Sequence, residues 1–238
     1  FSYNGPGISV PVTFKSELPQ VNAVIARADG RNVTARLIID LGSANAPVAL
    51  TTAFARSASL LKSSERYIQV TGVMSLYGSG VGRIQRVESV KLRDLEIVRP
   101  TVSISDALGA AVPTSIADGT IGMPVLRRTT MILDYRRSRI IFEKNSEFDA
   151  PYQFANVSGL QLERVGSVLR VRYVIAGTPA AESGMRVGDE IISVDGKPVP
   201  PAGSLNLPEL REPGTTHRLL IRRGGQTISI TIALRRLI

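Results

Sequence analysis

The chain has 238 residues, of which 43% are hydrophobic and 21% charged, a composition that is typical of globular proteins and excludes a disordered chain. It contains no cysteine and a single histidine, which excludes disulfide bonds and removes the usual ligands of a zinc site, so no metal and no cofactor are expected. The formal net charge of +9 is spread over both halves of the chain, which argues against the basic stripe of a nucleic-acid-binding protein.

The length allows two domains of ordinary size, and no run of about 18 apolar residues marks a membrane-spanning helix. The sequence begins with Phe1 and not with Met, so we expect a preceding segment that targets the protein or brings it into contact with a membrane. The densest basic cluster is expected to be a solvated surface suited to an anionic membrane face. It consists of Arg127, Arg128, Arg136, Arg137 and Arg139.

The first half of the chain shows the alternating pattern of β-strands, with strands expected over residues 7–14, 20–28, 31–39, 94–105, 130–135 and 139–144. Pro11 places the first of these at a sheet edge, and Asp29-Gly30 predicts a two-residue hairpin turn. A short helix is expected from Thr51 to Leu61. Residues 66–92 predict a mobile hairpin with a glycine-rich tip, SLYGSGVGR. We expect a mainly β domain over residues 1–150.

Residues 144–156 lose this periodicity and are interpreted as a linker. A new pattern follows, with strands expected over residues 159–165, 167–175, 189–194, 216–223 and 226–234. The segment TPAAESG predicts a short helix that ends at Gly184, and SLNLPELREP predicts a second helix that ends at Pro213-Gly214. These elements indicate an α+β domain over residues 156–238.

Asp40 is the strongest candidate for a catalytic group. A strand that ends in apolar Leu37, Ile38 and Ile39 delivers it to a tight turn, where Gly42 allows close approach of the backbone and Ser43 is expected to hydrogen-bond the carboxylate. Two carboxylates that share one proton can activate water and protonate a carbonyl oxygen. The structural alternative for Asp40 is an Asx turn or a cap of the helix that begins near Thr51.

Residues 33–46, VTARLIIDLGSANA, resemble the active-site loop of retropepsin-like aspartic peptidases, and residues 118–143 resemble the second half of that fold. The resemblance implies a closed β-barrel half domain, in which Thr120-Ile121-Gly122 crosses behind the Asp40 loop. It also implies a flap that closes over the substrate, formed here by Tyr77, Gly78, Ser79 and Gly80. Leu41 departs from the family, whose Thr or Ser at this position locks two catalytic loops together.

The chain offers one such Asp loop, because Asp29 and Asp195 are explained as hairpin turns. The resemblance therefore implies activity as a homodimer that pairs two Asp40 carboxylates. Other hydrolase chemistry is disfavoured: no G-x-S-x-G motif is present, and His217 would have to serve any serine triad.

Residues 158–234 resemble a bacterial-type PDZ domain, most clearly in AGTPAAESGMRVGDEIISVDGKPV, where Gly188 and Asp189 shape a turn. The family binds a peptide C-terminus as an added strand, with backbone N–H groups holding the terminal carboxylate. The matching positions are Ser158, Gly159, Leu160, Gln161 and Leu162, with Leu207 and Leu210 lining the pocket. The alternative is that these leucines are core residues.

Two hypotheses from different classes follow. The first is a dimeric aspartic endopeptidase whose PDZ domain captures polypeptides, and the second is a catalytically degenerate, PDZ-led peptide-binding adaptor. A third, suggested by the basic surface, is a structural protein of the cell envelope. The pairing of a PDZ domain with a peptidase resembles bacterial envelope proteins, so a periplasmic location is expected.

Overall fold

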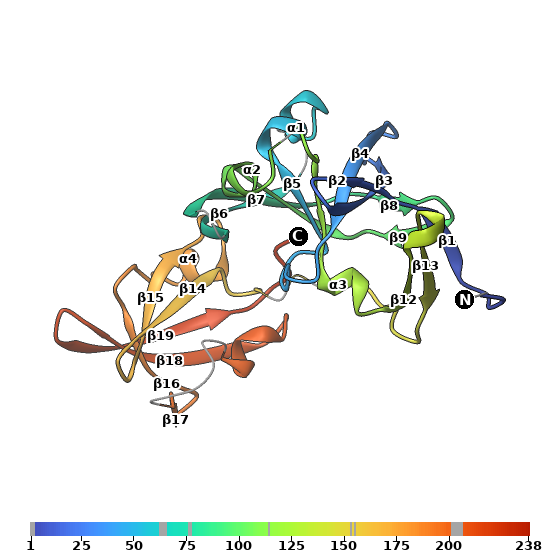
Figure 1. Cartoon of the computed structure of the whole chain (residues 1–238). Coiled ribbons are helices and arrows are strands. Elements are labelled where there is room, and N and C mark those ends of the chain that lie inside the picture. The colour runs from blue at the N-terminus through green and yellow to red at the C-terminus, as the bar shows by residue number, and fades with distance from the viewer. Residues whose placement is uncertain are drawn as a thin grey trace. The chain divides into compact units, whose positions relative to one another are not determined.

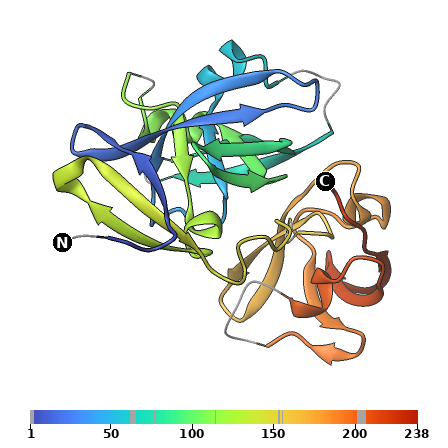
Figure 2. The same cartoon turned by 90° about the vertical axis from the view of Figure 1, so that its right-hand side faces the viewer.

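The computed structural model describes residues 3–61, 66–75, 78–113, 115–152, 154, 156–200 and 207–238, and for residues 71–75, 78 and 79 it describes the backbone alone. The chain divides into two compact units, Phe1–Gln153 and Phe154–Ile238 (Figure 1, Figure 2). Both units are built mainly from β-strands, which confirms the predicted fold class. Among the described residues, no helix is long and apolar enough to cross a membrane.

The described part of the N-terminal unit forms two sheets. The larger has the strand order β6-β7-β10-β5-β11-β4-β3-β8-β9, with β2 paired to β3, and the smaller has the order β1-β13-β12. The strands are β1 Ile8–Pro11, β2 Thr13–Lys15, β3 Leu18–Ala26, β4 Asn32–Ile39, β5 Val48–Thr51, β6 Tyr67–Ser75, β7 Gly78–Arg86, β8 Ser89–Leu92, β9 Leu95–Val98, β10 Thr101–Ser105, β11 Gly119–Ile121, β12 Thr129–Asp134 and β13 Arg139–Lys144. The helices are α1 Thr52–Ser57, α2 Asp106–Ala111 and α3 Met123–Leu126, and Tyr135–Arg137 form a 3₁₀ turn, η1.

The predicted hairpin between β3 and β4 is present, but its turn is longer than expected. Arg27 N–H donates to the carbonyl of Arg31, and Gly30 N–H donates to the carbonyl of Arg27, so three residues lie in the loop. Gly30 has a φ of 79°, the left-handed conformation that closes such a three-residue loop. Pro11 lies in β1, at the edge of its sheet, as predicted.

β11 lies between β4 and β5, although the chain connects β4 directly to β5. It pairs parallel to β4 and antiparallel to β5, so the 40–47 loop passes over its end. A Cβ on Gly119 would lie 2.1 Å from the carbonyl oxygen of Ala49, so only glycine fits between these strands. The segment 119–122 therefore crosses behind the Asp40 loop, in the place that the resemblance implies.

The predicted hairpin is present as the antiparallel pair β6–β7, but the glycines expected at its tip lie within β7. Gly78, Ser79 and Gly80 pair with Ser75, Met74 and Val73 across β6 and β7. Tyr77, one of the expected flap residues, lies outside the described residues. A Cβ on Gly80 would lie 3.6 Å from the backbone nitrogen of Ala107, which places α2 against β7.

The segment interpreted as a linker packs on the N-terminal unit as far as residue 152. Phe148 and Tyr152 are buried at 3% and 5% exposure and belong to that unit's core. The guanidinium of Arg128 stacks 4.0 Å from the centroid of the Tyr152 ring. Residues 144–152 of the linker predicted over 144–156 therefore belong to the first unit, because two aromatic side chains anchor them there.

The C-terminal unit contains one sheet with the order β14-β15-β16-β18-β19, and β17 pairs with β16. Its elements are β14 Leu160–Val165, β15 Val168–Val174, α4 Pro179–Glu182, β16 Glu190–Val194, β17 Lys197–Pro198, β18 Thr216–Arg223, β19 Gln226–Ala233 and the 3₁₀ turn η2, Pro208–Arg211. The helix expected over residues 204–213 falls partly outside the described residues, and its described part is the short η2. A second core fills the unit, around Leu169, Val171, Leu219, Ile221 and Ile232.

Candidate functional site

Asp40 lies directly after β4, at the start of the loop that leads to β5. Its backbone N–H donates to the carbonyl of Ile121 at 2.9 Å, so the end of β11 fixes the point where the loop begins. The carboxylate oxygen Oδ1 accepts the N–H of Gly42 at 2.9 Å, and the residue is partly exposed. Within the described part of the chain, Oδ2 has no hydrogen-bond partner and can meet another group at the loop surface.

Ser43 holds the loop through its backbone. Its N–H donates to the carbonyl of Asp40 at 3.3 Å, and its own carbonyl accepts the N–H of Met123 at 2.8 Å. The hydrogen bond expected from its hydroxyl to the carboxylate is not made in the structure, where Ser43 Oγ lies against Gly122. The loop is thus tied to β11 and α3 by main-chain groups.

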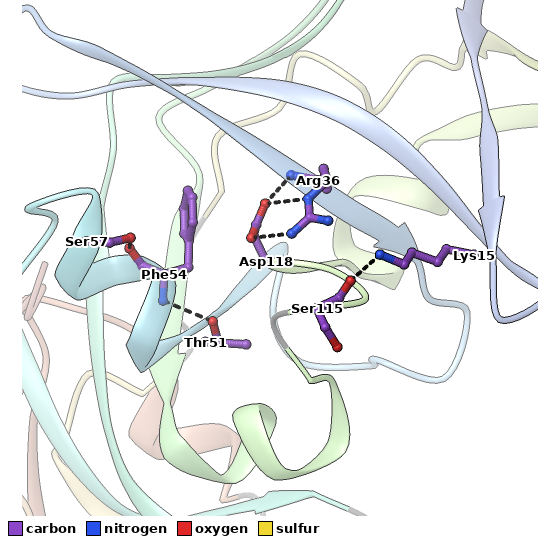
Figure 3. Close-up of polar contacts among 7 residues, drawn as sticks. All are labelled: Lys15, Arg36, Thr51, Phe54, Ser57, Ser115 and Asp118. Atoms are coloured by element: carbon purple, nitrogen blue, oxygen red, sulfur yellow. Dashed lines mark hydrogen bonds and ion pairs between the residues drawn. The ribbon is translucent and has the colours of Figure 1, made fainter.

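Of the two structural alternatives for Asp40, a helix cap and an Asx turn, the structure shows only the Asx turn. Helix α1 is capped by Thr51, whose Oγ1 accepts the N–H of Phe54 at 3.2 Å (Figure 3), so Asp40 does not cap it. The bond from Gly42 N–H to Oδ1 does close an Asx turn. This turn fixes one carboxylate oxygen and leaves the other open, which is compatible with a chemical role.

Sequence reasoning missed the ion pair at the start of β11. Asp118 precedes β11, and its Oδ2 accepts both the backbone N–H and the Nε of Arg36, at 2.8 and 3.2 Å. Its Oδ1 accepts Nη2 of Arg36 at 3.1 Å (Figure 3). These bonds raise the pKa of the Arg36 guanidinium and fasten the start of β11 to β4. The partners are far apart in sequence, so no local motif reveals them.

The predicted peptide groove begins at the turn that enters β14. Ser158 and Gly159 are buried in this turn, while Gln161 and Leu162 are partly exposed on β14. Three of the predicted leucines belong to the core of the unit, with exposed fractions of 8% or less: Leu160, Leu207 and Leu210. The structure therefore places these three leucines in the core, which is the alternative that the sequence left open.

Asn156 is part of this turn and was not singled out by sequence reasoning. Its Oδ1 accepts the N–H of Gly159 at 2.7 Å, and its Nδ2 donates to the carbonyl of Leu160 at 2.9 Å. Ser158 Oγ accepts the N–H of Leu160 at 3.2 Å. The backbone amides expected to hold a ligand carboxylate are therefore occupied by side chains of the turn itself.

Gly188 and Asp189 have the structural roles that the sequence predicts. Gly188 has a φ of 90°, and the Asp189 carboxylate accepts the N–H of Arg186 at 2.8 Å. This carboxyl is 1% exposed and also accepts Nε and Nη2 of Arg223, both at 2.7 Å. The paired bonds raise the pKa of Arg223 and compensate the buried charge.

His217 lies at the edge of the core, with its ring nitrogens 2.7 Å from Asp195 Oδ2 and 2.8 Å from Thr215 Oγ1. Its hydrogen bond is the largest cause of the lowered pKa of Asp195, and it pins the β16–β17 turn to β18. Among the described residues, no group of His, Asp and Glu side chains could hold a metal ion.

These features define a mainly β protein in two units. Residues 170–233 match the family model of the PDZ domain, so the chain contains a PDZ domain, as predicted from the sequence. Over 59 residues the chain is 42% identical to the serine protease HTRA1 of Xenopus tropicalis. The aligned part covers 25% of this chain and spans only 13% of the length of that relative.

The solved structures that align with the chain include two peptidases. A retropepsin-like aspartic protease from Rickettsia conorii aligns with 15% identity and a TM-score of 0.40, covering 57% of this chain and 89% of that chain. A serine endoprotease from Yersinia pestis aligns with 18% identity and a TM-score of 0.31, covering 96% of this chain and 67% of that chain.

Proposed function

We propose that this chain is an aspartic endopeptidase that is active as a homodimer and whose PDZ domain binds polypeptides. The observation that carries this proposal is the geometry of Asp40. Gly42 N–H fixes one carboxylate oxygen, and the main chain of β11 fixes the loop. The second oxygen remains open at a partly exposed surface, where a second carboxylate can approach it.

The need for a dimer follows from proton sharing. One carboxylate must be ionised to activate water while the other is protonated to polarise the carbonyl, so two must lie together. The other Asp-Gly pairs of the chain cannot supply the second group, because each carboxylate is held by a basic side chain. The pairs are Asp29 with Arg27 at 2.8 Å, Asp118 with Arg36 at 3.1 Å, and Asp195 with His217 at 2.7 Å.

Leu41 supports a second copy as the source of the missing carboxylate. Its side chain is 61% exposed, beside Asp40 and in the loop that would face the partner. Burial of a leucine contributes about 1.5–3 kcal/mol. In the proposed dimer, packing of the two Leu41 side chains takes the place of the hydroxyl hydrogen bonds that the resemblance implies.

The PDZ domain would deliver the substrate by adding an extended polypeptide to the open edge of β14. We also propose a periplasmic or cell-envelope location, which fractionation of cells that express the full-length gene would test. Finding the protein in the cytoplasm would contradict this location but would not contradict the proposed peptidase chemistry.

The test is cleavage of a mixed peptide library by the wild type and by Asp40→Asn, from about pH 3.5 to about pH 7.5. We expect new peptide termini with the wild type and with Asp94→Asn, a control at a carboxylate whose side chain is 79% exposed. The Asp40→Asn variant should give none. Equal cleavage by Asp40→Asn, or none by the wild type at concentrations where it is dimeric, would overturn the proposal.

The second candidate is a PDZ-led adaptor without catalysis. It is favoured by Leu41, which replaces the hydroxyl that locks the catalytic loops in the family that the sequence resembles. In that case the first unit would be a binding or dimerisation platform. Saturable peptide binding without cleavage in the same experiment would support this candidate.

A further inference from the structure

The turn that enters β14 is closed by its own side chains. β14 is the edge strand of the sheet, since the strand order begins with it (Figure 1). The carbonyl of Gly159 accepts the N–H of Ile175 at 2.9 Å. In an antiparallel pair this arrangement turns the N–H and C=O of the next residue, Leu160, away from β15 and toward the open edge.

These outward groups of Leu160 are the ones that an added strand would meet first. Both are already used: the N–H donates to Ser158 Oγ at 3.2 Å, and the C=O accepts Asn156 Nδ2 at 2.9 Å. The neighbouring N–H of Gly159 donates to Asn156 Oδ1 at 2.7 Å, a short and well-formed bond. Asn156 thus presents a carboxamide oxygen where a C-terminal carboxylate would bind.

We propose that Asn156 determines the ligand class of the PDZ domain by occupying the carboxylate position. The groove consequently gives no advantage to a free C-terminus and accepts internal, extended segments of polypeptide. This inference rests on the proposed peptide binding and deepens it, because it names which part of a polypeptide is bound.

The competition favours the side chain over an incoming carboxylate. Asn156 is tethered to the turn, so the effective concentration of its side chain is on the order of millimolar. This is well above the concentration of a free peptide ligand. A carboxylate that displaced it would gain a charge-assisted bond but would leave the carboxamide and the Leu160 carbonyl without their partners. An internal segment avoids this exchange at Gly159 and can pair further along β14.

The experiment uses the full chain and decapeptides that end in Ala, Val, Leu or Phe, each made as a free acid and as a C-terminal amide. The wild type should bind the two forms with dissociation constants within about twofold of each other. Asn156→Ala should bind the free acid about tenfold more tightly than the amide, because the Gly159 N–H becomes available to the charged ligand. The ratio of acid to amide affinity reports on the site and not on stability.

Asn156→Asp is a second variant of the same shape. Its negative charge would repel a ligand carboxylate, so free-acid binding should weaken about fivefold or more relative to the amide. Asn145→Ala is the matched control: Asn145 also accepts a backbone N–H and donates to a backbone carbonyl, in the other unit. It should leave the ratio unchanged.

A wild type that prefers the free acid by tenfold or more, with the same ratio in both Asn156 variants, would overturn the inference. Absence of binding of either peptide form to any variant would instead contradict the proposed peptide binding itself. The two failures are thus distinguishable.

Discussion

At Gly122 the end of β11 and the Asp40 loop pass so close that a methyl group does not fit. A Cβ built on this residue would lie 2.3 Å from the carbonyl oxygen of Ala46 and 2.6 Å from that of Ser43. Both obstacles are backbone atoms, so no side-chain rotation can relieve them. The position of the Asp40 carboxylate therefore depends on a glycine in another segment of the chain.

Gly122→Ala is expected to lower the free energy of unfolding by about 2–3 kcal/mol, because the loop must move to admit the methyl group. Gly109→Ala is the control, since a Cβ on Gly109 in α2 meets nothing within 4 Å. That change should raise stability by roughly 0.5–1 kcal/mol through helix propensity. Urea titration of the variants measures both, and equal effects would contradict the packing at Gly122.

Leu41→Ser is expected to weaken the proposed dimer by about tenfold or more in dissociation constant, because two exposed leucines lose their buried partner surface. The stability of the monomer should hardly change, since Leu41 is 61% exposed. Sedimentation across a concentration series measures the constant. Val98→Ser, at a side chain that is 59% exposed, should leave it unchanged.

An unaltered dissociation constant in Leu41→Ser would contradict the role of this loop in pairing.

Single residues were predictable from sequence where the signal is local. Gly188 and Asp189 follow a pattern of adjacent residues, and both have the predicted roles. Asp118 was not assigned because its partner, Arg36, lies in a distant strand. Asn156 was missed although its partners, Gly159 and Leu160, are close to it in the sequence. It lies in a segment without periodicity, so nothing in the pattern distinguishes it from a linker residue.

At the scale of elements, the β12–β13 hairpin is closed by a buried carboxylate. Asp134 ends β12 and is 7% exposed, and its Oδ2 accepts Nε of Arg139 at 2.9 Å and Nη1 of Arg137 at 3.2 Å. The bond from Arg139 is the largest cause of the lowered pKa of Asp134, against a smaller opposing effect of desolvation. The hairpin should therefore loosen in acid.

The sign of this effect follows from the lowered pKa. The carboxylate stabilises the fold fully above its unfolded-state pKa of about 3.9, and the contribution is lost as the pH falls through the lower folded-state value. Asp134→Asn should thus be clearly less stable than the wild type at about pH 6, and the difference should shrink below about pH 3. Urea unfolding at both pH values measures it. A difference that is constant with pH would contradict the assignment.

Some elements were predictable and others were not, for physical reasons. The strand pairs β3–β4 and β12–β13 alternate clearly and are joined by short turns, so both hairpins were found. Helix α2 was missed because it is short, although Ser105 caps it by accepting the N–H of Leu108. The glycines of β7 were taken for a tip because glycine in a strand resembles a turn until its pairing is known.

At the scale of the whole molecule, the chain forms two units with separate cores. The sequence indicates both, because periodicity breaks between them and the second half carries the PDZ pattern. The packing of Phe148 and Tyr152 on the first unit was not predictable, since both look like linker residues until their contacts are seen. Pairing between two copies leaves no periodic pattern in a sequence and stays a prediction.

Limited digestion with chymotrypsin should cut at Phe154 and spare Phe148. The boundary between the two compact units lies directly before Phe154, which is partly exposed. Phe148, in contrast, is 3% exposed and packed in the core of the first unit. Mass spectrometry of early fragments identifies the bonds cut. Early cleavage at Phe148 would contradict the packing of the segment on the first unit.

The most direct test of the central claim is a subunit-mixing experiment with peptidase activity as the readout. Inactive Asp40→Asn is mixed and re-equilibrated with the wild type at constant total concentration. If each active site needs Asp40 from both copies, activity follows the square of the wild-type fraction and falls to about one quarter in an equal mixture. A linear fall to about one half would show that each chain acts alone and would contradict the paired-carboxylate account.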